Sequence, residues 1–322
     1  MSRTRTFVVA AAVIAGASFA ALTAPTGADA KLRVGIADQK PDTYSNPFYT
    51  QELKVRRTRI IVPWNFSQRR GKGENPFLVG LIKTILDRKN IELMVHFGKD
   101  CNGKCKLPSV SKYRKAFKKF RQQYPKIKII GIWNEANHGD QPTKDSPKRV
   151  AEYYNAARKV CPTKCKLVGL DVLDDASLPR YTKEFLETAK SPKYIGLHNY
   201  KDVNDRKSTS TRALYKALKN RDGKVKQEIW LTETGGLNFF KTGKGKVVRK
   251  RSDERQRKAV KYLFELAQKS EFKDRITRIY YYHWKSDGLD EDKVRFDAGL
   301  LDPDGNRRPA YFEVLKNKKF LK

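Results

Sequence analysis

Beyond residue 30 the sequence lacks a second long apolar segment, a linker and any low-complexity tract. These absences favour a single domain that spans residues 31–322. The length suits one α/β barrel with a sizeable core. A recognisable nucleic-acid-binding motif is also missing, which makes nucleic acid the weakest of the possible anionic partners. Acidic residues are scarce: 35 Asp and Glu stand against 69 Lys and Arg, and the formal net charge is +34.

The excess of positive charge predicts attraction to an anionic polymer or surface. Acidic polysaccharide, teichoic acid and an anionic membrane surface all carry the required charge. A simpler interpretation, which we prefer for most of the lysines, is that they lie on solvated helix faces and confer solubility. We expect a monomer.

The first thirty residues have the layout of a secretory signal peptide. A short basic start with Arg3 and Arg5 precedes an apolar stretch at 7–22, and "ADA" at 28–30 offers a small-x-small cleavage site. The apolar stretch is shorter than the roughly 20 residues of a membrane-spanning helix, which disfavours an uncleaved anchor. We therefore expect cleavage after Ala30 and a secreted or cell-wall-associated protein without a membrane segment.

Cysteine is scarce as well, and the four residues form two C-x-x-x-C pairs, Cys101/Cys105 and Cys161/Cys165. In an exported chain such pairs favour disulfides over a metal site. Each pair is close enough in sequence to close a local loop, with turn-forming residues between its members. We expect local bridges, although the two other connectivities are also compatible with the sequence.

Short β-branched or apolar runs alternate along the chain with longer stretches of helical period. The alternation predicts right-handed βαβ units and a parallel sheet. Helices are expected between the runs, including two that begin after capping serines, Ser146 and Ser252. Eight units favour a (β/α)8 TIM barrel, in which functional groups lie at the C-terminal ends of the strands. The expected strands are 32–38, 57–64, 91–97, 128–134, 166–172, 194–200, 228–234 and 278–284.

Two glutamates fall at the ends of expected strands. Glu135 follows the strand at 128–134, in "GIWNEANHG", and Glu233 lies in "WLTETGG" at the end of 228–234. Because the strands of a barrel end on one rim, we expect the two carboxylates to lie close together. Glycoside hydrolysis by double displacement needs two carboxyl groups about 5 to 5.5 Å apart, whereas an inverting mechanism needs roughly 6.5 to 9.5 Å.

Together, "WNEAN" and "TETGG" resemble the catalytic signature of the retaining glycoside hydrolases of clan A, as in families 5, 39 and 128, the last being β-1,3-glucanase-like. The resemblance spans the chain after residue 30. It implies a glycosidase that cleaves O-glycosidic bonds of a polysaccharide or oligosaccharide and needs neither metal nor cofactor. Glu135 would be the acid/base and Glu233 the nucleophile.

The resemblance also implies substrate contacts near the strand ends. Asn134 matches the donor to a sugar 2-hydroxyl, and Arg59 with Tyr200 would stabilise the ionised form of Glu233. The general acid must hold its proton near neutral pH, and His198 or His138 could tune it. The alternatives are a structural ion pair for Arg59 and core packing for the histidines. The expected substrate-binding residues are Asn134, Arg59, His96, His198, Tyr200, Trp284 and Trp64. Asp171 lies near the same rim without a matching role.

A long basic loop follows Glu233. It could face the cleft and recognise an anionic glycan, such as a uronate-containing or phosphate-bearing cell-wall polymer. It could instead be a mobile surface loop that raises solubility or retains the protein at an anionic wall, and we prefer this interpretation. The cations of the loop are Lys241, Lys244, Lys246, Arg249, Lys250 and Arg251.

A different class of function is a non-catalytic barrel that binds cell wall or glycan through its basic surface. Loss of either carboxylate would favour that function. Both Glu135 and Glu233 are present, so the sequence favours the enzyme.

Overall fold

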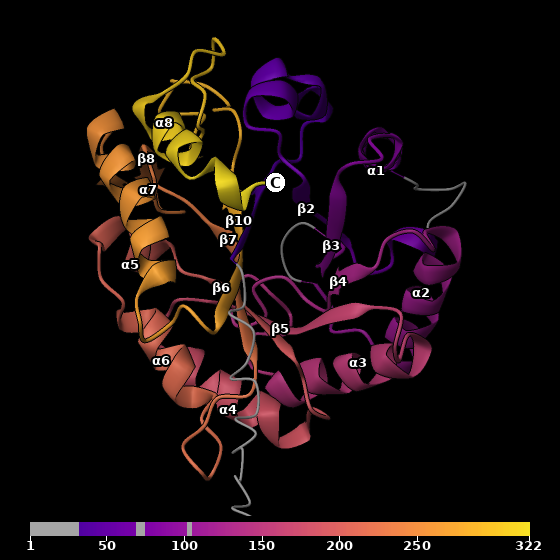
Figure 1. Cartoon of the computed structure of the whole chain (residues 1–322). Helices are drawn as coiled ribbons and strands as arrows, with labels where there is room; N and C mark the ends of the chain where they lie inside the picture. The colour runs from indigo at the N-terminus through magenta and orange to yellow at the C-terminus, as the bar shows by residue number, and fades with distance from the viewer. Residues whose placement is uncertain (1–31, 69–74, 102–104) are drawn as a thin grey trace, which may run out of the picture.

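The computed structural model describes residues 32–68, 75–101 and 105–322, so the expected signal peptide at 1–30 lies outside the described residues. Within them, eight parallel strands form one sheet in the order β1-β10-β7-β6-β5-β4-β3-β2, which curls into a nearly closed barrel (Figure 1). The (β/α)8 prediction is confirmed. The barrel strands are β1 (Arg33–Ala37), β2 (Arg57–Pro63), β3 (Glu92–Gly98), β4 (Ile129–Gly131), β5 (Lys166–Leu173), β6 (Tyr194–His198), β7 (Glu228–Thr234) and β10 (Ile276–Tyr282).

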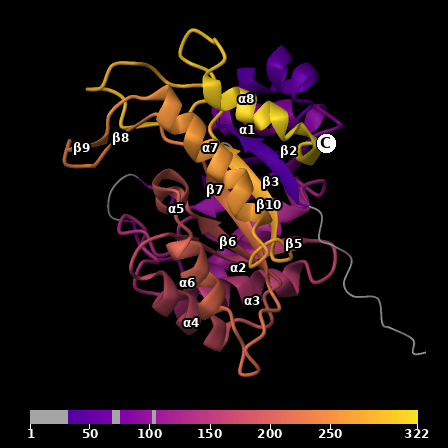
Figure 2. The ribbon, with the colours of Figure 1, turned by 60° about the vertical axis from the view of Figure 1, so that its left-hand side comes forward.

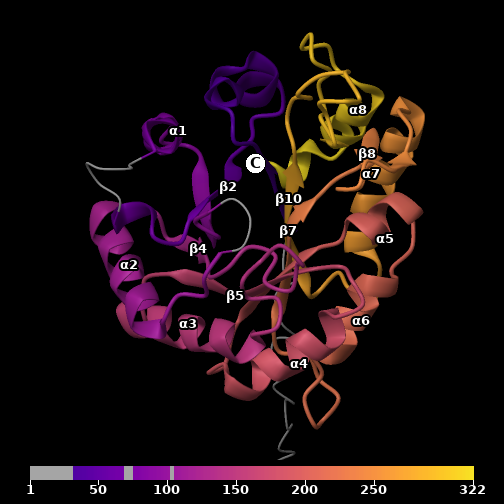
Figure 3. The same ribbon diagram turned by 180° about the vertical axis from the view of Figure 1, so that it is seen from behind.

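Helices surround the barrel, and Figure 3 shows α2, α3, α4 and α6 following one another along its outside. No helix in the described part of the chain is long and apolar enough to span a membrane. The helices are α1 (Pro76–Asp87), α2 (Val110–Gln123), α3 (Pro147–Val160), α4 (Leu178–Thr188), α5 (Tyr200–Asp205), α6 (Thr209–Ala217), α7 (Asp253–Gln268) and α8 (Pro309–Lys316), with short helical turns η1 (Pro41–Ser45), η2 (Phe48–Glu52), η3 (Phe66–Gln68) and η4 (Lys318–Phe320).

Helix α2 shows how the sequence sets this outer layer. The Ser109 side chain caps its first turn by accepting from the Lys112 amide at 3.3 Å. Phe117 and Phe120 lie on one face and are buried, where they meet Phe97 of β3 edge-on at 5.9 and 5.1 Å between ring centroids. Burial of each such ring stabilises the fold by about 2 to 3 kcal/mol. The apolar face of α2 therefore packs against the sheet, and its lysines lie on the outer face.

The first βα unit departs from the expected pattern, because the turns η1 and η2 stand in place of a regular helix. Their tyrosines hold them to the barrel. The Tyr49 hydroxyl donates to the Ile36 carbonyl at 2.8 Å, and the Thr58 hydroxyl of β2 donates to the same carbonyl at 3.0 Å. Side chains thereby bring the two end strands of the sheet, β1 and β2, together.

Strand ends and caps differ in part from the sequence predictions. The strand expected at 128–134 ends early, at Gly131, because the chain bends and the Asn134 amide then donates to the Phe97 carbonyl of β3 at 2.7 Å. Ser252 caps α7 through its side chain as expected. Ser146 precedes α3, but its side chain makes no capping hydrogen bond.

The basic loop after Glu233 carries strands β8 and β9, which join β11 from the chain after β10 in a second, three-stranded antiparallel sheet of order β11-β8-β9. Figure 2 shows the β8–β9 hairpin projecting from the barrel beyond α7. Buried Asp297 anchors the sheet, since Arg308 and Arg251 both donate to it at 2.9 Å. The strands are β8 (Phe239–Lys241), β9 (Val247–Arg249) and β11 (Phe296–Asp297).

Both cysteine pairs form the expected local disulfides, Cys101–Cys105 and Cys161–Cys165, with a Cα–Cα distance of 5.7 Å in each. No free cysteine occurs in the described residues. The second bridge closes the turn between α3 and β5, so it fixes a connection on the barrel surface and lies outside the cleft.

Candidate active site

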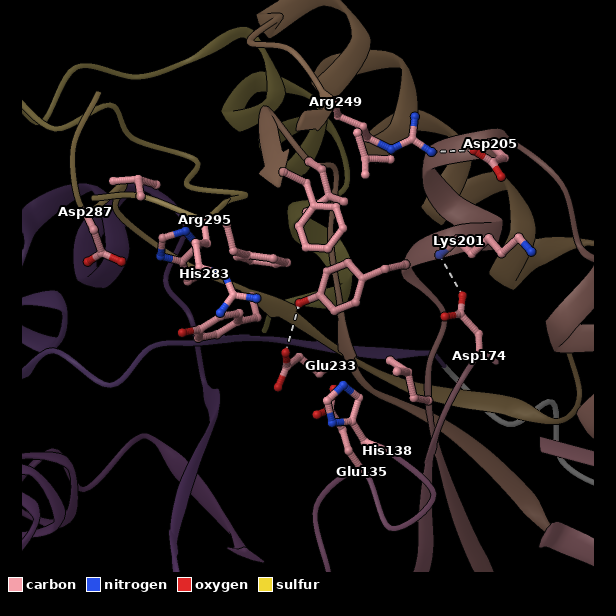
Figure 4. A pocket seen from close by; sticks show the side chains of 18 of the residues that line it. Glu135, His138, Asp174, Lys201, Asp205, Glu233, Arg249, His283, Asp287 and Arg295 are labelled. Carbon is pink, nitrogen blue, oxygen red and sulfur yellow. Dashed lines mark hydrogen bonds and ion pairs between the residues drawn. The ribbon is translucent and has the colours of Figure 1, made fainter. Parts of the chain in front are cut away.

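A cavity of about 740 Å³ opens at the C-terminal ends of the strands (Figure 4). Glu135 and Glu233 lie at its floor. One wall is aromatic and comes from four separate segments: α5, the end of β10, β8 and β11. Its rings are those of Tyr200, Tyr282, Phe240 and Phe296.

The two glutamates meet as the strand ends predicted. One carboxylate oxygen of Glu135 and one of Glu233 lie within 4.8 Å of each other and of a ring nitrogen of His198. This spacing would suit a metal ion, but both His198 nitrogens already face carboxylates, Glu135 and Asp171, at 3.0 Å. A histidine ligates a metal only through a deprotonated nitrogen, so this set is better suited to holding a proton.

Glu135 has a backbone φ of 46°, in the left-handed region that non-glycine residues rarely adopt. Such strain costs on the order of 1 to 3 kcal/mol and persists only where the surroundings enforce it. Here the next amide, of Ala136, donates to the Asp171 carbonyl at 2.8 Å, and the His138 amide donates to the Glu135 carbonyl at 2.9 Å. These bonds turn the carboxylate toward the cavity.

Glu233 is held by both expected partners. Arg59 donates from Nη1 to its Oε2 at 2.8 Å, and the Tyr200 hydroxyl donates to its Oε1 at 3.1 Å. Arg59 also donates from Nη2 to the Asn134 side-chain oxygen and from Nε to His96 Nδ1 at 2.7 Å. The guanidinium therefore fixes the position of three side chains from three strand ends.

Beneath the carboxylates lies a buried polar layer centred on Asp171 of β5. Its Oδ2 is 3.0 Å from His198 Nε2 and 3.8 Å from Arg59 Nη2, and the Thr232 hydroxyl donates to its Oδ1. Burial would raise the pKa of Asp171, but the positive charge of His198 outweighs burial and holds that pKa well below its usual range. Asp171 has no exposed surface, so it balances the cations and does not contact substrate.

Two glycines make room for this layer. A Cβ on Gly131 would lie 1.5 Å from the His96 ring, and a Cβ on Gly196 would lie 2.0 Å from Asp171 Oδ1. Any larger residue at either position would displace the polar side chains. Glycine is therefore required inside these two strands, where it is otherwise unfavourable.

His198 and Glu135 have opposite pKa shifts. Burial alone would lower the pKa of His198, but the charges of Asp171 and Glu233 and its hydrogen bonds raise that pKa to about 10. For Glu135, burial would raise the pKa, yet the hydrogen bond and charge of His198 lower it. Both directions favour a proton on His198, in contact with Glu135, in the free protein.

Comparison with known proteins decides the family. The family described as "Glycosyl hydrolase catalytic core" matches residues 93–311, more than half of the chain. The chain belongs to this glycosyl hydrolase family. It is a glycosidase, as the two strand-end glutamates predicted. A comparison with curated protein sequences gives no match.

Solved structures similar to this glycoside hydrolase share its barrel at low sequence identity. A family 39 glycoside hydrolase from Bacteroides cellulosilyticus WH2 is 17% identical, with a TM-score of 0.58. The match covers 89% of this chain and 63% of that protein. A GH39 enzyme from Xanthomonas axonopodis pv. citri is 14% identical with a TM-score of 0.63, covering 91% and 67%. Xylanase 10B from Thermotoga maritima is 12% identical with a TM-score of 0.61, covering 90% and 96%. This chain therefore spans about two thirds of the two family 39 proteins, and the likeness is one of fold.

Of the seven expected substrate-binding residues of this glycoside hydrolase, Tyr200 lines the cavity and the other six do not. Trp284 is 1% exposed because β10 ends at Tyr282, and the chain then turns Trp284 between Tyr49 and Tyr311. Trp64 stacks on Tyr113 of α2 at 6.4 Å. His96 is fully buried, and burial lowers its pKa to about 3, so it is a neutral acceptor for Arg59. The aromatic rings that line the cavity are those of Tyr200, an expected residue, and of Tyr282, Phe240 and Phe296.

Of the aromatic wall, the sequence predicted Tyr200 but not Tyr282, Phe240 or Phe296, and the last two lie in very short strands. His198 and Arg59 are almost completely buried and act through the glutamates. Asn134 and Tyr200 lie beside Glu135 and Glu233. Of the six cations of the basic loop, Arg249 alone is among the residues that line the cavity, together with Phe240 and Val248 of the same loop.

Stability should depend on pH through His198. Its pKa of about 10 exceeds the ordinary value of 6.5, so the folded protein holds an extra proton between these values. The stabilisation is fully present below about pH 6.5 and is lost as pH rises toward 10. We expect the difference in free energy of unfolding between wild type and His198→Gln to shrink across that window. Urea unfolding at pH 6, 8 and 10 measures it, and a constant difference would contradict the assignment.

Proposed function

We propose that this glycoside hydrolase is a secreted retaining enzyme that cleaves O-glycosidic bonds of a polysaccharide, with Glu135 as acid/base and Glu233 as nucleophile. The observation that carries the proposal is the approach of their carboxylate oxygens to within 4.8 Å. Retaining enzymes have carboxyl groups about 5 to 5.5 Å apart, and inverting enzymes need roughly 6.5 to 9.5 Å to admit a water molecule. The two local disulfides support secretion, because such bonds persist in oxidising compartments.

In the first step Glu233 attacks the anomeric carbon and forms a glycosyl ester as the bond to the leaving-group oxygen breaks. That oxygen takes a proton from Glu135. Arg59 and Tyr200 hold the attacking carboxylate in place and stabilise its charge in the free enzyme. In the second step Glu135 accepts a proton from water, whose oxygen bonds to the anomeric carbon while the ester to Glu233 breaks.

The proton for the leaving group is held by the pair of Glu135 and His198. Their hydrogen bond is 3.0 Å long, so one proton can move from His198 Nδ1 to the Glu135 carboxylate without any other motion. A sugar that fills the cavity excludes water, which favours the neutral carboxylic acid over the carboxylate. The free and substrate-bound enzymes would then hold this proton on different atoms.

Asn134 is placed to bind the sugar ring beside Glu135. Because its side-chain oxygen accepts from Arg59, its amide nitrogen is oriented away from Arg59 and is available to donate to the sugar 2-hydroxyl. A contact of this kind strengthens in an oxocarbenium-like transition state. Tyr200, Tyr282 and Phe296 provide apolar faces against which the rings of the glycan can stack.

The anomeric configuration of the first product tests the mechanism. Purified protein lacking residues 1–30 would be screened on β-glucans, xylan, arabinan, uronic-acid polymers and cell-wall preparations by release of reducing ends. Proton NMR on the best substrate should then show the anomer of the substrate before mutarotation. The opposite anomer would contradict retention. Binding without release, unchanged in Glu135→Gln and Glu233→Gln, would indicate a glycan-binding barrel instead of an enzyme.

A further inference from the structure

Most charged side chains on the wall of the cavity beyond the catalytic glutamates already have an ion-pair or hydrogen-bond partner. The carboxylate of buried Asp174 accepts the backbone amide of Lys201 at 2.6 Å, and Figure 4 shows the Lys201 side chain extending away from the two glutamates. The remaining ion pairs that involve the cavity wall are Arg249–Asp205, Lys40–Asp287 at 2.6 Å and Lys293–Asp290 at 3.1 Å.

Two cations of the wall differ, Lys201 and Arg295, and of these the Arg295 side chain extends toward the glutamates (Figure 4). Among the residues that the structure describes, no carboxylate pairs with its guanidinium and no side-chain hydrogen bond satisfies it. Figure 4 shows its side chain reaching into the cavity on the side of Glu233. The turn of the β8–β9 hairpin backs the guanidinium, since a Cβ on Gly243 would lie 3.0 Å from Nη2. One edge of the group is therefore supported by backbone, and the other faces the space where a glycan would lie.

Aromatic side chains that a sugar ring could stack on lie next to Arg295. Phe296, the next residue, packs edge-on against Tyr200 at 5.2 Å and near Tyr282 at 6.0 Å, and these are the rings offered to the glycan. Tyr200 in turn contacts Glu233. A sugar stacked on this wall is thus held between the nucleophile and an unneutralised cation.

We propose that Arg295 binds the carboxylate of a uronic acid residue, so that the enzyme acts on an acidic glycan. A guanidinium presents a planar fork that matches the two oxygens of a carboxylate. A uronate carboxylate also carries the single negative charge that one unpaired arginine would neutralise. The inference rests on the proposed glycosidase, whose substrate class it specifies. The excess of surface lysines would add long-range attraction for the same polymer.

The test compares each polymer with a version that lacks only its charge. Alginate, polygalacturonate and glucuronan would be used as native polymers and after reduction of the carboxyl groups to hydroxymethyl groups. For the wild type we expect kcat/KM to be at least about tenfold higher on one native polymer than on its reduced form. Arg295→Gln should lower the native value by about tenfold or more and leave the reduced value within about twofold. Lys246→Gln, an exposed cation on the same hairpin, removes equal charge and should preserve the preference.

Several results would overturn the inference. They are equal rates on native and reduced polymers, equal losses on both in Arg295→Gln, the same loss in Lys246→Gln, or a preference for phosphodiester-bearing wall polymer over every uronate.

If no polymer is hydrolysed, binding separates the inference from the proposed function. Calorimetry would then be done with Glu233→Gln and with the double variant that also carries Arg295→Gln. Tighter binding of a native polymer than of its reduced form, lost in the double variant, would uphold carboxylate recognition while the enzymatic proposal fails. Equal binding of the two forms would refute carboxylate recognition as well.

Discussion

Glu233→Gln is expected to lower kcat/KM at least about a thousandfold on every substrate. This corresponds to an increase of about 4 kcal/mol in activation free energy. The amide keeps the size of the carboxylate but cannot attack the anomeric carbon, so the glycosyl ester does not form. It also leaves the Arg59 guanidinium without the carboxylate that it contacts at 2.8 Å. Reducing-end release on the best polymer measures the loss.

A matched control lies on the same strand. Glu228 begins β7 at the opposite end of the barrel, where its Oε2 accepts from the Thr277 hydroxyl at 2.7 Å, and Glu228→Gln should retain activity. Chemical rescue identifies the role. Azide added to Glu233→Gly should restore turnover on an activated aryl glycoside and give a glycosyl azide of inverted configuration. Rescue that gives retained configuration would contradict the nucleophile assignment.

Asp171→Asn is expected to have the second largest effect and to act on the fold as well as on activity. The carboxylate is fully buried and is the counter-charge of His198 and Arg59. Removing one partner from a buried ion pair costs about 3 to 5 kcal/mol, because the remaining charge is left uncompensated. Urea unfolding should show a loss of this size, whereas Asp222→Asn on an exposed turn should change stability by less than about 0.5 kcal/mol.

The pKa of His198 distinguishes a positioning role for Asp171 from mere packing. Since the Asp171 charge raises the pKa of His198 to about 10, NMR titration of Asp171→Asn should show that pKa moving down toward its ordinary value. The proton shared with Glu135 would then be lost at lower pH, and the alkaline limb of the kcat/KM profile should shift the same way. An unchanged His198 pKa, together with a stability loss under about 1 kcal/mol, would contradict this role.

The sequence predicted the barrel and its paired glutamates because both depend on local patterns. Apolar runs define the strands, and a strand end fixes the rim on which a side chain lies. The family resemblance supplied the contact of Arg59 with Glu233, whose residues lie 174 positions apart. Asp171 was placed near the rim without a role, because its depth in the barrel depends on strand register that a single strand does not reveal.

The aromatic residues show a second reason why some site residues were predicted wrongly from the sequence. Trp284 was expected to contact sugar because it ends an apolar run, but the strand stops two residues earlier and the ring packs into the protein interior. Phe240 and Phe296, which do line the cavity, belong to β8 and β11, segments of three and two residues that carry no periodic signal. The two rings meet because the chain after β7 pairs with the chain after β10.

The small sheet of β8, β9 and β11 has a consequence for how this enzyme can change over time. Its strands lie outside the ladder of the barrel, yet they supply one side of the cleft, while Glu233 lies in β7 and Glu135 in the turn after β4. Insertions, deletions or exchange of the hairpin can therefore alter which sugars are accepted without moving the two glutamates that we propose as catalytic. Substrate preference in this lineage should diverge fastest at the hairpin, and grafting hairpins between relatives is a rational route to new specificities.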